Sequence, residues 1–148
     1  MPQVFQNSMF ILIILLSGCL PKNQQGTFIE PHCLNSQSQC LIKTDIGDFD
    51  ILFNVKTVIT EQEFNIIVKN NSLNENLEIN GFIEGKEMYM GKIPLFFQNN
   101  DKQIYIATTM LGSCSEEKMI WRMWFTVTDK LKKEETQKFF IDFKSYRR

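Results

Sequence analysis

Apolar and polar residues alternate along most of the chain after residue 47. In residues 48–54, for example, Phe49, Ile51 and Phe53 are apolar and share one face of an extended chain. A side-chain period of two is typical of β-strands with one buried face, and we predict such strands here and in five later segments. Their apolar positions are Phe64, Ile66 and Val68; Leu77 and Ile79; Ile104 and Ile106; Trp121, Met123, Phe125 and Val127; and Phe139, Ile141 and Phe143.

Short polar segments separate these runs. They are residues 46–48, 70–72, 99–101 and 111–113, which contain the Gly, Asn, Asp and Ser residues typical of turns. No segment keeps a helical spacing, and the mixed charges of residues 130–138 fit a solvated hairpin loop better than a helical turn. We predict an all-β fold, an antiparallel immunoglobulin-like β-sandwich of roughly seven to eight strands over residues 32–148, with a small barrel as the alternative.

The N-terminal segment has the composition of a secretory signal. Residues 1–21 contain no charged side chain, and the apolar run of residues 9–16 is shorter than the roughly 20 residues of a membrane-spanning helix. The run closes with Leu16-Ser17-Gly18-Cys19, which resembles the lipobox of bacterial lipoproteins. The resemblance implies cleavage before Cys19, a diacylglycerol thioether on its sulfur, and a new amino group that can carry a further acyl chain such as palmitate.

This resemblance predicts a membrane attachment. Several acyl chains hold a protein on a membrane far better than one chain does. We therefore expect a signal peptide over residues 1–18, a lipidated Cys19 with a tether over residues 19–31, and a location in the cell envelope. The residue after Cys19 is Leu20 and not Asp, which by the resemblance to lipoproteins implies the periplasmic face of the outer membrane and not the inner membrane. Residues 1–8 lack Lys and Arg, and a buried N-terminal strand is the alternative interpretation.

Charge and composition exclude several functions. The chain has 16 Lys and Arg against 17 Asp and Glu, and a net charge of -1 argues against a nucleic-acid partner. It has one His, no glycine-rich phosphate loop and no Cys-x-x-Cys motif, so most hydrolase, nucleotide and thiol-redox chemistries are hard to assemble. We predict a protein that is not an enzyme.

Four cysteines set the candidate thiol chemistry. Lipidation would use Cys19, and Cys33 and Cys40 are near neighbours that we expect to form a disulfide in an oxidising compartment. Cys114 is then left over, and an odd thiol in a secreted protein points to intermolecular pairing, reactivity or metal binding. A buried structural cysteine is one alternative. A zinc site of His32 with Cys33, Cys40 and Cys114 is another.

Methionines lie near the leftover thiol. Met88 and Met90, two apart on an expected strand, would point to the same face, and Met110 and Met119 flank the segment that contains Cys114. Thiolate and thioether sulfurs select Cu(I) over hard cations. We predict a Cu(I) site of Met88, Met90, Cys114 and Met119, in which Met110 could replace one methionine. The alternative is that these methionines fill gaps in the core.

The same residues carry a family resemblance. The ten residues 88–97, which begin Met-Tyr-Met-Gly, resemble the Met-x-Met-Gly stretch of YtkA-like and FixH-like periplasmic domains, and the Cys-x4-Met-x-Trp spacing from Cys114 to Trp121 is similar to the second half of that pattern. The resemblance covers residues 80–127. It implies an immunoglobulin-like sandwich linked to copper handling and cytochrome oxidase assembly, although this chain has no His near the Met pair.

Two functional hypotheses follow from the sequence. In the first, the chain is a lipid-anchored envelope protein that binds Cu(I) or delivers it to a copper-receiving envelope protein. In the second, it is a non-catalytic envelope lipoprotein whose sandwich binds a protein partner while its methionines serve packing.

Overall fold

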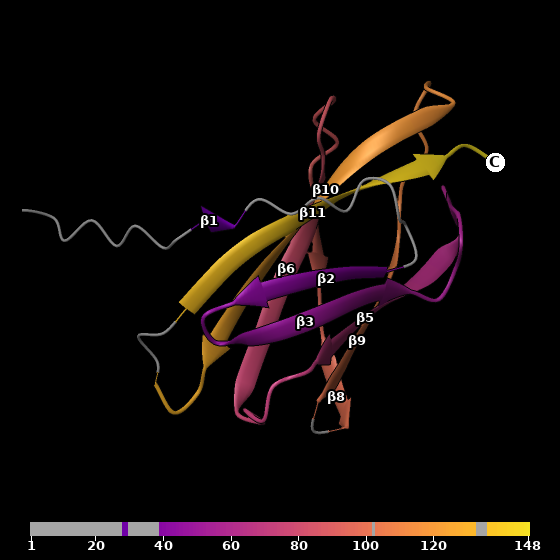
Figure 1. The fold of residues 1–148 in the computed structure, drawn as a ribbon. Coiled ribbons are helices and arrows are strands. Elements are labelled where there is room, and N and C mark those ends of the chain that lie inside the picture. The colour runs from indigo at the N-terminus through magenta and orange to yellow at the C-terminus, as the bar shows by residue number, and fades with distance from the viewer. Residues whose placement is uncertain (1–27, 30–38, 102, 133–135) are drawn as a thin grey trace, which may run out of the picture.

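The computed structural model describes residues 28–29, 39–101, 103–132 and 136–148 of the 148-residue chain. These residues form eleven strands and contain no helix (Figure 1). The strands are β1 (Phe28–Ile29), β2 (Gln39–Thr44), β3 (Gly47–Phe53), β4 (Val58–Ile59), β5 (Glu63–Asn70), β6 (Leu77–Gly85), β7 (Lys92–Leu95), β8 (Gln98–Asp101), β9 (Ile104–Met110), β10 (Lys118–Asp129) and β11 (Thr136–Tyr146).

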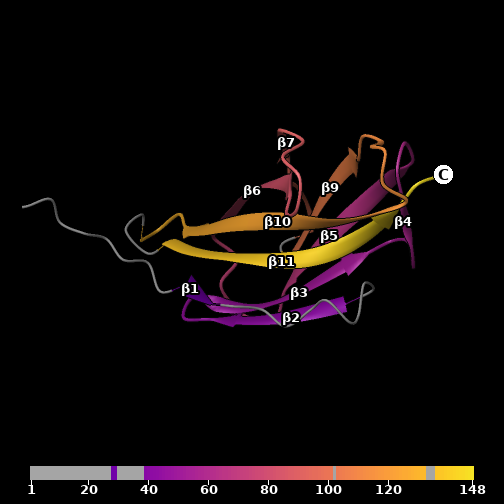
Figure 2. The ribbon, with the colours of Figure 1, turned by 90° about the horizontal axis from the view of Figure 1, so that it is seen from above.

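The strands form two sheets. One has the order β1-β11-β10-β6-β7, with β4 also paired to β11, and the other has the order β2-β3-β5-β9-β8. Figure 2 shows β10 and β11 side by side in one layer above β2 and β3 in the other. Neighbouring strands are antiparallel except β1 and β4, two short strands that pair with β11 in parallel. The predicted antiparallel β-sandwich is confirmed, and Phe28–Ile29, which belong to the expected tether, form strand β1.

The longest strand pair joins β10 to β11, from Lys118 opposite Tyr146 to Thr128 opposite Thr136. Along β10 every second side chain is buried, in the order Met119, Trp121, Met123, Phe125 and Val127, as the alternation predicts. Asp129 ends β10 and Thr136 begins β11, so the charged segment between them is the connection of a β-hairpin. The expected hairpin is therefore confirmed, but residues 136–138 of the predicted loop belong to β11.

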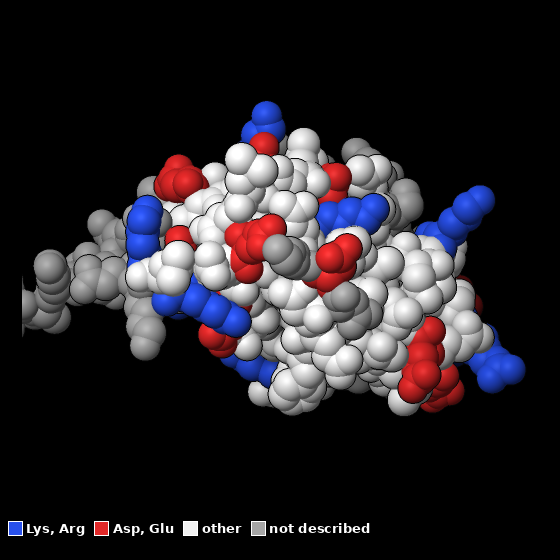
Figure 3. All heavy atoms as spheres, turned by 90° about the horizontal axis from the view of Figure 1, so that it is seen from below, with Lys and Arg blue, Asp and Glu red and all other residues white. Residues whose placement is uncertain are grey.

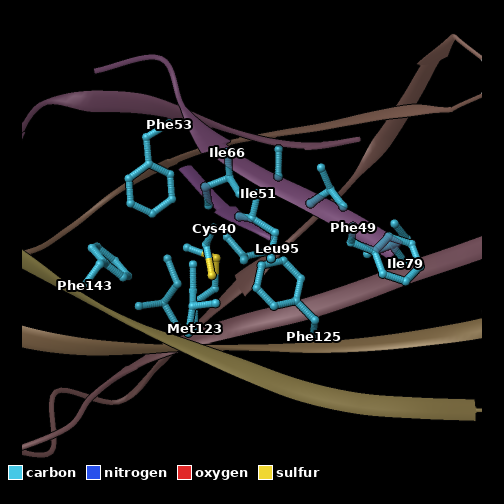
Figure 4. Packing of buried hydrophobic residues seen from close by; sticks show 14 of the residues in the cluster. Cys40, Phe49, Ile51, Phe53, Ile66, Ile79, Leu95, Met123, Phe125 and Phe143 are labelled. Atoms are coloured by element: carbon cyan, nitrogen blue, oxygen red, sulfur yellow. The ribbon is translucent and has the colours of Figure 1, made fainter. Parts of the chain in front are cut away.

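Aromatic side chains fill the space between the sheets. The Phe139 ring on β11 stacks on Phe125 of β10 at 5.1 Å and on Phe49 of β3 at 5.9 Å, measured between ring centroids. Phe143 meets Phe53 of the opposite sheet at 5.1 Å. Figure 4 shows Phe49, Phe53, Phe125 and Phe143 among the aliphatic side chains of the core. Burial of each such side chain contributes about 1.5–3 kcal/mol, so the contacts across the layers supply much of the stability.

The core face of β9 differs from the prediction. Ile104 and Ile106 are half-buried, whereas Tyr105 is 3% exposed and Ala107 is fully buried. The pairing with β5 explains this, because it places Tyr105 beside Val68, which faces the core. The Tyr105 hydroxyl donates a hydrogen bond to the Leu77 carbonyl at 3.1 Å, and burial raises the pKa of Tyr105 and keeps this donor protonated.

The polar segment of residues 99–101 was also predicted wrongly as a turn. It belongs to β8, an edge strand whose register with β9 shifts between Asn99 and Asp101. Such a shift is a β-bulge, in which one strand holds an extra residue opposite its partner. Polar residues without a regular apolar alternation can therefore still belong to a strand.

One buried carboxylate ties three strands together on the outer face of the first sheet. Asp142 of β11 is 7% exposed and accepts hydrogen bonds from Arg122 of β10 at 2.8 and 2.9 Å. It also accepts one from the Nζ of Lys86, the residue after β6, at 2.6 Å. Burial alone would raise the pKa of Asp142, but the hydrogen bonds and charges of Arg122 and Lys86 outweigh it and hold the pKa below its ordinary value.

The Asp142 carboxylate should make the free energy of unfolding depend on pH in the acidic range. A carboxyl group with a lowered folded-state pKa stabilises the fold above its unfolded pKa of about 4, and that contribution is lost as the pH falls through the folded-state pKa. We expect Asp142→Asn to lower the free energy of unfolding at pH 7 by about 2–3 kcal/mol, because two cations lose their partner. The difference from the natural chain should shrink as the pH is lowered below 4.

Urea unfolding followed at several pH values measures this difference. Asp48→Asn is the matched control, since Asp48 lies on the outer face of β3 next to the inward Phe49. Equal pH dependence of the two variants would show that Asp142 contributes no linkage.

Candidate functional site

Two connections lie at one end of the sandwich. One joins β6 to β7 through residues 86–91, and the other joins β9 to β10 through residues 111–117. Both appear at the top of Figure 1, where β10 begins. They carry three of the four predicted ligands, Met88, Met90 and Cys114, and the fourth, Met119, is the second residue of β10. We call these two connections, together with Met119, the sulfur end.

The β6–β7 connection folds back on the end of β6. A Cβ atom at Gly85 would collide with the carbonyl oxygen of Met88 and lie 3.1 Å from the Cε of Met119. The absence of a side chain at Gly85 therefore lets the connection close against the start of β10. The backbone N–H of Lys86 completes the closure by donating to the Ile120 carbonyl at 3.0 Å.

The expectation that Met88 and Met90 share one face of a strand was wrong. Both residues lie in the connection, where the chain turns back over Gly85 and Gly91 adopts a φ of 78° before β7 begins. Their exposure differs accordingly. The Met88 side chain is 44% exposed, whereas Met90 is half-buried and packs against the core.

The β9–β10 connection holds Cys114 in a hydrogen-bonded turn. Cys114 is a free, half-buried cysteine that packs against the core, and its Sγ accepts a hydrogen bond from the Glu116 N–H at 3.3 Å. Arg147, just after β11, donates from its Nη1 to the Ser115 carbonyl at 3.1 Å and from its backbone N–H to the Glu117 carbonyl at 2.9 Å. The C-terminal residues thus fix the turn that carries the thiol.

The remaining methionines lie on strands. Met119 is 5% exposed and belongs to the core, yet its terminal methyl group is in contact range of Gly85, at the base of the β6–β7 connection. Met110 is 52% exposed and lies opposite Glu63 in the pairing of β9 with β5. Met119 therefore adjoins the base of the connection that carries Met88 and Met90, whereas Met110 ends β9 at the pairing with Glu63.

Several sequence predictions fall outside the described residues. Cys19, His32 and Cys33 lie there, so lipidation, the Cys33–Cys40 disulfide and the zinc alternative stay predictions. Cys40 lies on β2, the edge strand of the second sheet, and its side chain is buried in the core between the sheets. Within the part of the chain that the structure describes, no group of three or more His, Cys, Asp or Glu could hold a metal ion.

The described residues also contain no helix that is long and apolar enough to cross a membrane. On the face shown in Figure 3, Lys and Arg side chains are interspersed with Asp and Glu, and neither sign forms a continuous area.

Sequence reasoning missed three residues that shape the sulfur end: Gly85, Lys86 and Arg147. The polar run of residues 84–87 contains the turn signal of a Gly among charged residues. The partners of Lys86 and Arg147 depend instead on how β6, β10 and β11 are paired, which local sequence does not reveal.

Comparison with known proteins shows the fold alone. No protein-family model and no curated protein matches the chain. Among solved structures, a DUF4426 family protein from Pseudomonas aeruginosa PAO1 is similar with a TM-score of 0.53 and 14% identity, over 74% of this chain and 96% of that one. A DUF4785 family protein from Legionella pneumophila is similar with a TM-score of 0.54 and 10% identity, over 71% of this chain, which spans 29% of that protein.

Gly85 offers a test of how the sulfur end is built. We expect Gly85→Ala to destabilise the domain by about 1–3 kcal/mol, because the added methyl group must displace the backbone of Met88. Gly112→Ala is the control, since a Cβ atom at that position of the neighbouring connection would have no heavy atom within 4 Å. Denaturant midpoints of both variants measure the effect, and equal midpoints would contradict the tight closure at Gly85.

Proposed function

We propose that this chain is a lipid-anchored envelope protein that binds or delivers Cu(I) through Cys114, Met88, Met90 and Met119. One observation carries the metal assignment. The connection that bears Met88 and Met90 packs at Gly85 against the methyl group of Met119, and the strand that begins beside Met119 follows directly from the Cys114 turn. Two sulfur-bearing segments that are distant in sequence, residues 88–90 and 114–119, thus adjoin the same strand, β10.

The donor set suits a soft monovalent ion. A thiolate supplies the single negative charge, and thioethers, which carry no proton near neutral pH, add soft neutral donors without proton competition. The partial burial of Cys114 and Met90 shields a bound ion from water, while the exposed Met88 offers a first contact for an ion arriving from a partner. This difference in exposure supports transfer as well as storage.

The proposed anchor enters the domain far from the sulfur end. Strand β1 pairs with Lys138 and Phe139 at the start of β11, whereas Arg147 holds the Cys114 turn just beyond the end of that strand. The eight residue steps from Phe139 to Arg147 span roughly 26 Å of extended chain. Phe28, nine residues after the proposed lipidation site, therefore lies at the end of β11 opposite the Cys114 turn, an arrangement that suits delivery to an envelope partner.

A second candidate function also has a specific observation in its favour. Tyr89 is 79% exposed and Phe96 is 77% exposed, and they flank β7, the edge strand of the first sheet. Exposed aromatic side chains of this kind are enriched in protein-binding surfaces. Under this candidate the sandwich is a non-catalytic module that binds a protein, and Met90, Met119 and Cys114 serve packing.

Copper titration separates the two candidates. We expect the full chain in detergent, reduced and free of other metals, to bind one Cu(I) in competition with a Cu(I) chelator. Cys114→Ser should weaken binding most, because it removes the only anionic sulfur. Met88→Leu and Met90→Leu should each weaken it with little loss of stability, since Leu nearly conserves the volume of Met.

Met123→Leu is the control, because Met123 is a fully buried core methionine that belongs to no part of the candidate ligand set. Stoichiometry well below one, or an affinity that none of the three substitutions alters, would refute the copper assignment and favour the protein-binding candidate.

The anchor has its own test. Mass spectrometry of the native protein should show a mature chain that begins at acylated Cys19, and the protein should fractionate with membranes. Cys19→Ala should abolish labelling by a fatty-acid probe. Recovery of a native chain that retains Met1, or that carries no acyl group, would contradict the proposed attachment.

A further inference from the structure

We infer that Lys86 is a positioning residue of the Cu(I) site, which fixes the Met88–Met90 connection against Met119 through its bond to the buried Asp142. The inference rests on the proposed copper function. It names the residue that would hold the β6–β7 connection beside Met119 and the Cys114 turn. Lys86 occupies the first position of the β6–β7 connection, two residues before Met88.

Lys86 attaches the connection at two points. Its backbone N–H bonds to the Ile120 carbonyl of β10 at 3.0 Å, and its Nζ reaches across the sheet to the Oδ2 of Asp142 on β11 at 2.6 Å. One residue therefore links the connection to both strands of the central β10–β11 pair. The Met119 methyl group lies close to Gly85, at the base of the same connection. The two bonds of Lys86 therefore hold Met88 and Met90 beside β10, the strand that follows Cys114.

The partner of Lys86 is itself fixed. Asp142 is 7% exposed and takes two hydrogen bonds from Arg122, whose guanidinium lies 3.8 Å from the centroid of the Phe140 ring. Lys86 is the more exposed partner at 37%. Loss of the Lys86 amine leaves Asp142 paired with Arg122, so the sandwich should keep its fold while the connection loses one of its two attachments.

A metal ligand depends on the residues that orient it, and loss of such a residue typically lowers metal affinity by about 10–100-fold. We therefore expect Lys86→Gln to weaken Cu(I) binding within that range. Gln is chosen because it removes the charge and adds no sulfur. Lys86→Arg should keep the Cu(I) affinity of the natural chain, since the arginine guanidinium can reach the same carboxylate of Asp142.

The decisive measurement is a double-mutant cycle on the full chain in detergent, read by competition with a Cu(I) chelator. If Lys86 acts by placing Met88 and Met90, Lys86→Gln should weaken binding in the natural background and have almost no further effect in a Met88→Leu/Met90→Leu background. A purely structural role would give the same fractional loss in both backgrounds.

Lys92→Gln is the matched control. Lys92 is a cation of the same hairpin whose Nζ lies 4.3 Å from the centroid of the Phe82 ring, and it has no bond to Asp142 among the described contacts. It should leave Cu(I) affinity unchanged.

The outcomes separate the inference from the function on which it rests. If Cys114→Ser and Met88→Leu/Met90→Leu weaken binding but Lys86→Gln does not, or does so equally in both backgrounds, the positioning role of Lys86 is refuted while the copper site stands. If the natural chain binds no Cu(I), the proposed function has failed before Lys86 is tested.

Discussion

The pairing of β10 with β11 is the constraint on which the rest of the structure depends. Its register turns one face of β10 into a continuous buried row, from Met119 to Val127, and sets Phe139, Ile141 and Phe143 beside it. The other strands of that sheet build outward from this pair: β6 lies along β10, the two short parallel strands β1 and β4 lie along β11, and β7 pairs with β6 at the edge. The second sheet then closes over the row through contacts between aromatic rings. Because both connections of the sulfur end adjoin the start of β10, the same register also sets how the sulfur-bearing residues lie relative to one another.

The outer face of this sheet is organised by the same register. Pro94, Phe82, Trp124 and Phe140 lie side by side across four strands, and the neighbouring cross-strand row is Lys92, Glu84, Arg122 and Asp142, which alternates in charge. Trp124 donates its indole N–H to Glu84 at 2.8 Å, and Arg122 lies against the Phe140 ring. Cross-strand pairs of opposite charge and of aromatic rings each add a fraction of a kcal/mol to about 1 kcal/mol. These rows explain why a face directed away from the core still holds the half-buried Phe82 and Trp124 and the buried Phe140.

Alternation in the sequence predicts those parts of the fold that it physically determines. Strands β3, β5 and β10 are long and have one buried face, and their apolar period of two is plain in the sequence. Strand β11 shows the same period in Phe139, Ile141 and Phe143, although Phe140 and Asp142 on its outer face are buried as well. The strands β1, β4, β7 and β8 have two to four residues, too few to show a period, and owe their existence to partners elsewhere in the chain. On β9 the large apolar residues Ile104 and Ile106 led to a wrong prediction of the buried face. The buried positions are instead those of Tyr105, Ala107 and Thr109. Their small or hydrogen-bonded side chains fit opposite β5. The candidate ligands could be chosen by their sulfur chemistry, but the turn at Gly85 and the bond from Lys86 to Asp142 depend on tertiary pairing.

The similarity to two bacterial structures at 14% and 10% identity shows that this sandwich tolerates almost complete replacement of its sequence. Such tolerance is expected where any set of apolar residues with the right period can fill the core. Function in a fold of this kind is set by the connections, since they are free of the packing constraint and yet held in place by rigid strands. In this chain two charged residues bond to the connections of the sulfur end: Arg147 fixes the Cys114 turn and Lys86 fixes the methionine connection. Packing alone would not require two charged residues to hold two sulfur-bearing loops beside the same strand, and this arrangement is the strongest physical reason to look for a ligand there.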